Sequence, residues 1–329
     1  MTNRRTLLKS ATAIFALSFA VPVFAQSNEP IRVVATFSIL GDMVERIGGE
    51  HIALTTLVGP DGGAHVYQPT PQDAKAVSGA EILFVNGLEF EGWIDRLTEA
   101  SGFDGTSVVA TAGITPISLD EEDEHGDDHG DEHAEGEDHD HAEEAKGDHD
   151  HDHGAFDPHA WQSIPNAVIY VDNITAALAQ ANPENAAAFY QNRTAFVAEL
   201  EALDSEIRAQ IAAVPQDQRR VVTSHDAFGY FAATYGLEFL APQGMSTESE
   251  ASAKDVAALI TQIREQSIGA VFVESISDSR LLEQLVSETD ATIGGTLYSD
   301  ALSDPDGPAG TYLEMMHHNL AMLTGALKS

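Results

Sequence analysis

Short runs of apolar residues alternate along this chain with segments of helical spacing. Ile31 to Phe37 reads IRVVATF, a run typical of a strand buried on both faces. The segment from Ile39 to Ile47 has helical spacing and stops at Gly48-Gly49. Further strands are expected at about Ile52 to Val58 and at EILFV near residue 83, with a short helix from Pro71 between them and a later helical segment that ends at about Gln180. Strands that alternate with helices favour a parallel sheet covered on both faces.

The second half of the chain repeats this alternation. A strand at RVVTS leads to His225, IGAVFVE forms a second strand, and ATIGG leads into a third. Four segments predict helices, namely the residues that follow His225, Ala253 to Gln266, Ser279 to Glu288 and Tyr312 to Leu327. The fold class is therefore α/β in both halves.

A much longer helix is expected between the two halves, beginning at Pro183. Apolar residues recur there at steps of three and four: Phe189, Phe196, Val197, Leu200, Leu203, Ile207 and Ile211. A helix of about 30 residues would be about 45 Å long at 1.5 Å per residue. Such a helix can brace two lobes rigidly against each other.

The first 25 residues are typical of an export signal. Arg4, Arg5 and Lys9 precede a short apolar stretch, and Val23-Phe24-Ala25 suits a signal peptidase that cleaves after about Ala25. The paired arginines also resemble a twin-arginine signal, so both the general secretory and the twin-arginine routes stay open. The mature protein is therefore expected in a periplasm.

Composition narrows the function classes. The net charge is −37, which argues against nucleic acid and anionic membranes as partners and for attraction of cations. The chain contains no cysteine, so any metal site must use nitrogen and oxygen ligands. A lipid-anchored lipoprotein is not expected either, since no cysteine lies near the cleavage site.

Residues 120–154 are almost entirely carboxylates and imidazoles. The segment contains no branched aliphatic or aromatic residue, so nothing offsets the entropy of ordering it, and a disordered acidic loop is expected. A plain solvated linker does not need histidine. Eight histidines suggest weak auxiliary metal binding, and they are His125, His129, His133, His139, His141, His149, His151 and His153.

Four residues stand at the ends of expected strands or in loops: His65, His159, His225 and Asp300. Binding sites in parallel α/β folds lie beyond the carboxyl ends of the strands. Three imidazoles and one carboxylate would make a complete tetrahedral set for zinc. Their wide separation provides no local metal motif, and a single loop histidine is often only exposed or hydrogen-bonded.

Four motifs in order resemble the cluster 9 (A-I) metal-binding proteins of ABC importers. They are His65-Val-Tyr-Gln-Pro-Thr-Pro-Gln-Asp, Asp157-Pro-His-Ala-Trp, Ser224-His-Asp-Ala-Phe-Gly-Tyr-Phe and Tyr298-Ser-Asp. The resemblance implies two pseudo-symmetric βα lobes joined by a long rigid helix, with a metal held in the cleft. It implies His65, His159, His225 and Asp300 as ligands, and the membrane permease of an ABC importer as partner.

Related proteins that carry manganese have Glu at the third ligand position, where this chain has His225. A third imidazole favours zinc, because carboxylates suit manganese better. We therefore expect a periplasmic protein that captures zinc for an importer. A manganese or iron carrier and a periplasmic zinc buffer stay open as alternatives. A zinc hydrolase would need an open coordination position and a nearby general base. Glu274 in FVESISD could reach a cleft, but it is also a plausible salt-bridge partner, so no residue supplies that base convincingly.

The expected domains are an N-terminal lobe over 26–182, a linker helix over 183–213 and a C-terminal lobe over 214–329. We expect a monomer that is not an enzyme, with a periplasmic zinc donor as a further partner to consider. His51, His317 and His318 are expected to be structural or exposed, and Trp161 and Tyr67 to pack in the core or wall the cleft. Asp157 either orients His159 or begins the turn at Pro158.

Overall fold

The structure is a computed structural model that describes residues 29–119, 156–247 and 251–327. The expected export signal and the acidic segment 120–154 with its eight histidines lie outside these ranges. No helix in the described ranges is long and apolar enough to cross a membrane.

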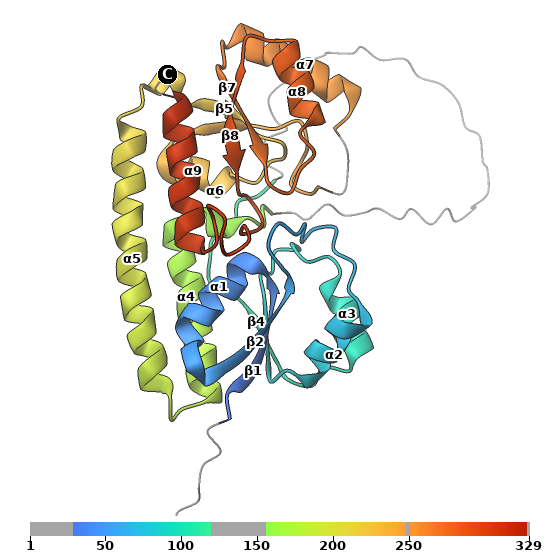
Figure 1. The fold of residues 1–329 in the computed structure, drawn as a ribbon, viewed down its shortest axis with the longest axis vertical. Coiled ribbons are helices and arrows are strands. Elements are labelled where there is room, and N and C mark those ends of the chain that lie inside the picture. Colours follow the sequence, from blue (N-terminus) through green and yellow to red (C-terminus); the bar gives the residue numbers. More distant parts are fainter. Residues whose placement is uncertain (1–28, 120–155, 248–250, 328–329) are drawn as a thin grey trace, which may run out of the picture.

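Four parallel strands form the sheet of the N-terminal lobe, in the order β2-β1-β3-β4. They are β1 (Ile31–Phe37), β2 (Ile52–Val58), β3 (Ile82–Val85) and β4 (Thr106–Val109). Helices α1 (Ser38–Gly48) and α4 (Ile164–Ala181) cover one face, and α2 (Pro71–Gly79) and α3 (Ile94–Ser101) cover the other (Figure 1). In the central strand β1 only Arg32 is exposed, as a continuous apolar run predicts.

The C-terminal lobe repeats this strand order as β6-β5-β7-β8, again all parallel. Its strands are β5 (Arg220–Val222), β6 (Glu238–Leu240), β7 (Ala270–Glu274) and β8 (Thr292–Leu297). Helices α7 (Ala253–Glu265) and α8 (Arg280–Ser287) lie on one face, and α6 (Gly229–Tyr235) and α9 (Tyr312–Leu327) on the other. The expected α/β architecture with two parallel-sheet lobes is confirmed.

Two hydrophobic cores hold the molecule. The inner core is continuous from β1 through α4, α5 and α9 to Phe272 in β7. The outer core lies between the C-terminal sheet and α7 and α8, and consists of Val222, Val256, Leu259, Ile260, Ile263, Ile268, Val271, Leu282, Leu285 and Ala291. Successive strand residues face opposite sides. Val271 therefore belongs to the outer core and Phe272 to the inner core.

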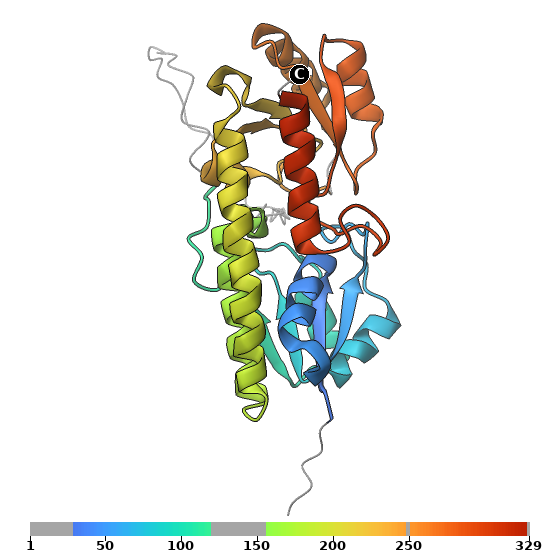
Figure 2. The ribbon, with the colours of Figure 1, turned by 60° about the vertical axis from the view of Figure 1, so that its left-hand side comes forward.

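The long helix α5 (Ala186–Ala212) runs beside both lobes (Figure 2). Its 27 residues form one uninterrupted helix that packs along α4, α1 and α9. It begins three residues after the expected start at Pro183, because the Asn182 side chain accepts the N–H of Asn185 and closes a turn. The apolar face at three- and four-residue steps is buried: Phe189, Phe196, Leu200, Leu203, Ile207 and Ile211.

Among the α-helices and strands of the described ranges, three short ones were not predicted: α3 (Ile94–Ser101), β4 and β6. Strand β4 has only one half-buried residue and β6 has three residues in all, so neither shows a period-2 apolar pattern. Helix α3 buries only Leu97 fully. The state of such short segments depends on the neighbours they pair with rather than on their own residues.

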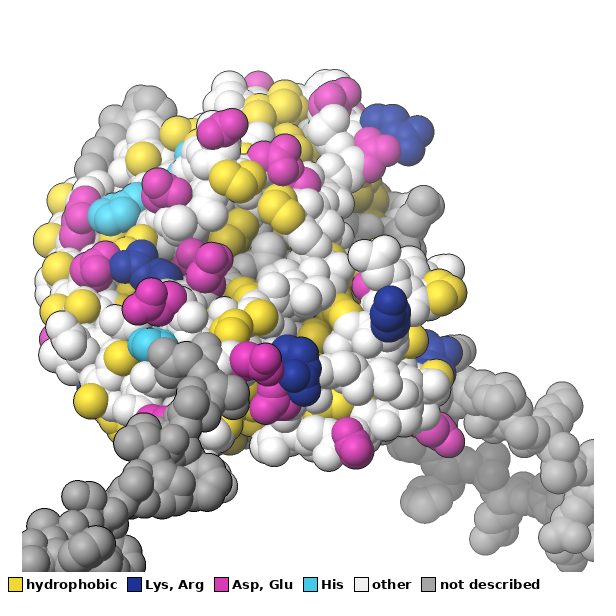
Figure 3. Space-filling model, turned by 60° about the horizontal axis from the view of Figure 1, so that its bottom comes forward, with side chains coloured by type: hydrophobic (Ala, Val, Ile, Leu, Met, Phe, Trp, Pro, Cys, Tyr) yellow, Lys and Arg dark blue, Asp and Glu magenta, His cyan; other side chains and the backbone are white. Residues whose placement is uncertain are grey.

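The space-filling view of one end of the molecule agrees with the acidic composition (Figure 3). Acidic side chains are spread over this face, and Lys and Arg side chains lie singly among them. Among the described residues visible here, no continuous basic patch is formed. Such a surface attracts cations and repels polyanions.

Candidate metal centre

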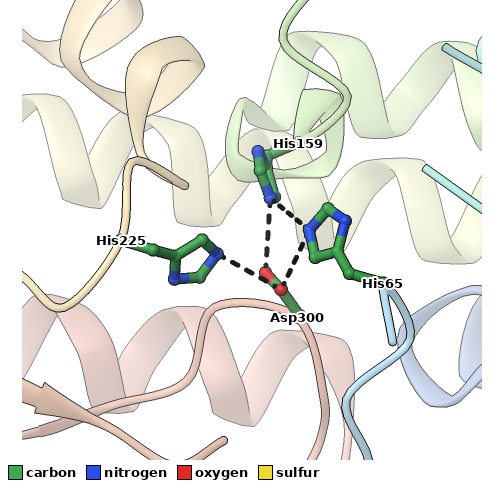
Figure 4. Close-up of side chains that lie close together, drawn as sticks. All are labelled: His65, His159, His225 and Asp300. Atoms are coloured by element: carbon green, nitrogen blue, oxygen red, sulfur yellow. Dashed lines mark hydrogen bonds and ion pairs between the residues drawn. The ribbon is translucent and has the colours of Figure 1, made fainter. Parts of the chain in front are cut away.

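Four side chains from separate loops converge between the two lobes (Figure 4). Three of the loops follow β2, β5 and β8, and the fourth precedes the short helix η2 (Ala160–Gln162). They bring together His65, His159, His225 and Asp300, with one ligand atom of each within 4.8 Å of the others. His65 is 8% exposed and the other three are fully buried. The cluster is therefore closed to bulk water except beside His65.

All three imidazoles direct Nε2 toward the carboxylate of Asp300. The Nε2 atoms of His65 and His225 lie 3.4 and 3.3 Å from Oδ2, and that of His159 lies 3.6 Å from Oδ1. Both Asp300 oxygens lack a hydrogen-bond partner among the described residues, although buried polar atoms are normally paired. A cation here would meet three nitrogens and one carboxylate, which is the closed ligand set of tetrahedral zinc sites.

The charges of the cluster stabilise an anionic carboxylate. Burial acts to raise the pKa of Asp300, but His225 and His159 beside it hold that pKa well below its usual range. Burial acts to lower the pKa of His225, but Glu274 and Asp300 raise it well above its ordinary value. The pKa of His65 is lowered, chiefly by burial. Asp300 is therefore ionised at neutral pH and can offset part of the charge of a divalent cation.

Two further carboxylates lie behind the imidazoles. Asp157 Oδ1 accepts the backbone N–H of His159 and lies 2.8 Å from its Nδ1, so Asp157 contacts this imidazole as well as beginning the turn. Glu274, at the end of β7, accepts the backbone N–H of His225 and lies 2.7 Å from its Nδ1. Glu274 is buried against this imidazole. Of the two roles open to Glu274, these contacts fit an ion-pair partner and not a free general base.

Aromatic rings enclose the cluster on the side of the N-terminal lobe. Phe90 stands edge-on to His65, with ring centroids 4.6 Å apart, and Trp161 lies 5.3 Å from His159. Trp161 is fully buried and donates Nε1–H to a backbone carbonyl. Tyr67 packs against the inner core and donates its hydroxyl hydrogen to an oxygen of Asp73. Trp161 therefore both fills the core and walls the site.

The sequence did not predict that the loop carrying Phe90 would contact the site. Leu88 and Glu89 both have positive φ, at 53° and 61°, which is a costly conformation for residues other than glycine. The buried carboxylate of Glu91 holds this loop by accepting the N–H of Asn86. The sequence position of this loop could have indicated its role, because NGLEFEGW directly follows β3 at the carboxyl end of the sheet, where binding sites of parallel α/β folds lie.

The loop of Asp300 follows the C-terminal sheet but is bonded to the N-terminal lobe. The Ser299 carbonyl accepts Nε2–H of Gln162 at 2.9 Å. The backbone N–H of Leu302 donates to Oγ of Ser38 at 2.9 Å. Asp300 is therefore positioned by contacts with both lobes.

The histidines expected to lie elsewhere do so. His51 packs edge-on against Phe189 and belongs to no cluster of possible ligands in the described ranges. His317 is half exposed and lies 3.7 Å from Glu206, and His318 bonds a backbone carbonyl of β8. These three residues have structural or surface roles.

Two parallel-sheet lobes with a buried cluster of three imidazoles and a carboxylate between them define a solute-binding protein for a divalent cation. Residues 33–326 match the family model described as "ZnuA: Zinc-uptake complex component A periplasmic". The chain belongs to this family of periplasmic metal-binding proteins of ABC importers. It is a solute-binding component of such a transporter and not an enzyme.

Characterised relatives differ in the metal that their names give. The manganese-binding lipoprotein MntA of Bacillus subtilis is 33% identical, over 92% of this chain and 91% of its own length. The iron-binding protein YfeA of Yersinia pestis is 31% identical over 95% and 91%. Membership of the family therefore establishes a divalent metal but not which one.

Solved structures show the same fold. The periplasmic zinc-binding protein TroA of Treponema pallidum has a TM-score of 0.78 at 29% identity, over 91% of this chain and 99% of that one. A manganese-bound mutant of a periplasmic metal-binding protein from Candidatus Liberibacter asiaticus has a TM-score of 0.76 at 30% identity, over 91% and 100%. Neither neighbour alone decides the metal of this chain.

Proposed function

We propose that this protein captures zinc in the periplasm and delivers it to the membrane permease of an ABC importer. The proposed ligands are His65, His159, His225 and Asp300. The observation that carries the proposal is the buried convergence of three imidazole nitrogens on one carboxylate. Three neutral nitrogens favour zinc over manganese, which prefers oxygen-rich sites.

Competition with a chromophoric chelator tests this choice of metal. The purified protein is titrated with zinc, manganese and iron(II), each against the same chelator, and zinc is expected to bind most tightly. The runner-up is a manganese or iron carrier, which the names of two relatives favour. Tighter binding of manganese or iron(II) than of zinc would establish that alternative.

We propose that the acidic segment gathers zinc for the cleft without supplying a ligand to it. The described residues on either side of the segment meet, because Ser118 and Phe156 pair in an antiparallel bridge. The segment can therefore be replaced by a short linker without stretching the fold. Ions bound there would be held at high effective concentration only a few residues before His159.

Deletion of residues 120–153 tests this role. The tight site is expected to persist, additional weaker zinc is expected to be lost, and loading at scarce zinc is expected to slow. Calorimetry gives the stoichiometry and stopped-flow mixing at two salt concentrations gives the loading rate. A matched variant with all eight segment histidines replaced by Gln separates imidazole binding from charge.

Two results of this deletion would contradict the proposal. Loss of the tight site would mean that the segment supplies a ligand, or that the protein is a zinc buffer built on the segment. Unchanged stoichiometry and rate would mean that it is only a solvated loop.

The domain bounds, the oligomeric state and the partners are also proposals. We assign an N-terminal lobe to 26–182, a linker helix to 183–213 and a C-terminal lobe to 214–329. The protein acts as a monomer that docks on the permease, and a periplasmic donor is a further candidate source of its zinc. Sedimentation with and without zinc tests the monomer.

A further inference from the structure

Asp157 and Glu274 each hold one histidine, His159 and His225 respectively, but they differ in which carboxylate oxygens make the contacts. Each contacts both the backbone N–H and Nδ1 of its histidine. Both carboxylates and both imidazoles are at most 1% exposed. A buried negative charge facing Nδ1 favours the imidazole form that has its proton on Nδ1, which leaves the lone pair of Nε2 for a metal.

One oxygen of Asp157 makes both contacts. Oδ1 lies 2.8 Å from the backbone nitrogen of His159 and 2.8 Å from its Nδ1. Oδ2 is buried and has no hydrogen-bond partner among the described residues. An amide in place of this carboxylate can therefore keep its oxygen at the Oδ1 position and lose neither contact.

Both oxygens of Glu274 are needed. Oε1 accepts the backbone N–H groups of Ser224 and His225 at 2.7 and 2.9 Å. Oε2 lies 2.7 Å from Nδ1 of His225 and has no other polar partner among the described residues. The carboxylate thus holds the loop with one oxygen and the imidazole with the other.

We propose that Glu274 is a positioning residue of the metal site, which presents Nε2 of His225 to the metal and can do so only as a carboxylate. Asp157 positions His159 in the same way but tolerates an amide. The proposal rests on His159 and His225 being metal ligands, as proposed above, and it holds whichever divalent metal the cleft takes.

An amide at position 274 has no acceptable orientation. With its oxygen on the Ser224 and His225 N–H groups, its NH₂ group meets Nδ1 and favours the imidazole protonated on Nε2, which cannot bind a metal through that nitrogen. With the amide reversed, the NH₂ group opposes two buried N–H donors. Either orientation weakens metal binding through His225.

Two amide variants of equal charge test the proposal, Glu274→Gln and Asp157→Asn. Each loses one negative charge near the site, so the shared electrostatic loss cancels when their metal affinities are compared. Replacing such an outer carboxylate typically costs about 10- to 100-fold in affinity. We therefore expect zinc to bind at least about tenfold more weakly to Glu274→Gln than to Asp157→Asn. Affinities within about threefold of each other would overturn the proposal.

Asp42→Asn is the matched control. It removes a mostly buried carboxylate that also accepts a backbone N–H, that of Tyr312, but contacts none of the proposed ligands. Its zinc affinity is expected to stay within about threefold of the parent, which is under about 1 kcal/mol. Thermal unfolding of the metal-free variants shows whether each one is folded.

Imidazole NMR adds a readout that a purely structural role would not move. In the ¹⁵N-labelled, zinc-loaded parent protein, His159 and His225 are expected to carry protons on Nδ1 and to bind zinc through Nε2. In Glu274→Gln the Nδ1 proton of His225 should be lost or displaced, while that of His159 stays. If Glu274→Gln does not fold, the NMR spectrum of the zinc-loaded parent protein still tests the proposal. Coordination of zinc by Nδ1 of His225, rather than by Nε2, would overturn it.

Repeating the titrations with manganese separates this proposal from the proposed function. A parent protein that prefers manganese would overturn the assignment to zinc. The ratio of the two amide variants, measured with manganese, would still test the role of Glu274.

Discussion

The two lobes have the same strand order but are held by different cores. Both faces of the N-terminal sheet pack into the inner core, which continues through α4, α5 and α9. The C-terminal sheet is divided between cores, with Phe272 facing the inner core and Val271 the outer one. The N-terminal lobe is thus part of one large unit, whereas α7 and α8 depend on a small separate core.

This difference bears on how the four proposed metal ligands are held. His65 and His159 belong to the large unit, and the loop of Asp300 is bonded to it through Gln162 and Ser38. His225 follows β5 and is held by Glu274 from β7, two strands of the divided sheet. The structure therefore links three of the proposed ligands to the inner core, and the fourth, His225, to the boundary between the inner and outer cores.

The largest effect is expected from Phe196→Ala in the inner core. Phe196 is 1% exposed in the middle of α5, and removing a buried phenyl ring typically costs about 3–5 kcal/mol. The free energy of global unfolding should fall by that amount in urea titrations of metal-free protein. Tyr190→Ala on the exposed side of the same helix is the control, with an expected change under about 0.5 kcal/mol.

Leu282→Ala tests whether the outer core opens separately. Leu282 is fully buried in α8, and the substitution is expected to cost about 2–5 kcal/mol within the outer core. Hydrogen exchange should accelerate in α7, α8 and β8 while α5 keeps its protection, since regions of lower stability open locally. Equal acceleration in α5 would show that the two cores unfold as one.

Asp300→Ala removes the one carboxylate of the ligand cluster. The cation would lose its anionic partner in a buried site, so zinc affinity is expected to fall about 100-fold, or about 2.7 kcal/mol. The chain should stay folded, because its loop keeps its bonds to Gln162 and Ser38. Chelator competition measures the loss, with exposed Asp304→Ala as control. A change under about threefold would exclude Asp300 as a ligand.

The smallest effect is expected where α1 meets α9. Asp42 accepts the backbone N–H of Tyr312. Burial raises the pKa of Asp42 to about 6, and the charges of Glu45 and Glu314 add to this rise. The hydrogen bond from Tyr312 and the charge of Arg46 oppose it. An unfolded chain ionises this group near pH 4. The folded state therefore holds the extra proton between about pH 4 and pH 6, and its stability declines as pH rises through that window.

Asp42→Asn should remove this decline. The amide oxygen can still accept the N–H of Tyr312, while the charge that costs free energy above about pH 6 is absent. A pKa difference of about two units corresponds to about 2.7 kcal/mol. The neutral amide is a weaker acceptor for the Tyr312 N–H than a carboxylate, so we expect a net gain of about 1 kcal/mol at pH 7.5 and a flatter profile from pH 4 to 6. Urea unfolding with a chelator present measures both. Parallel profiles for the variant and the parent would contradict the assignment.

The residues by themselves determined the class of fold and the candidate ligands. Buried strands appear as continuous apolar runs such as IRVVATF, and the apolar face of α5 repeats at helical steps, because both patterns are local and periodic. His65, His159, His225 and Asp300 stood out because each lies at a strand end or in a loop and in a motif shared with a known family.

Only the tertiary structure decided what surrounds the ligands. Glu274 contacts His225, which is 49 residues away, and Glu91 accepts the hydroxyl hydrogen of Thr36, which is 55 residues away, so no local pattern could pair them. Strand β6 is too short to show a period, and it forms because it pairs with β5. The burial of a helix or strand face can be predicted from residues close together in the sequence. The partner of a buried charge depends instead on which loops the fold brings together.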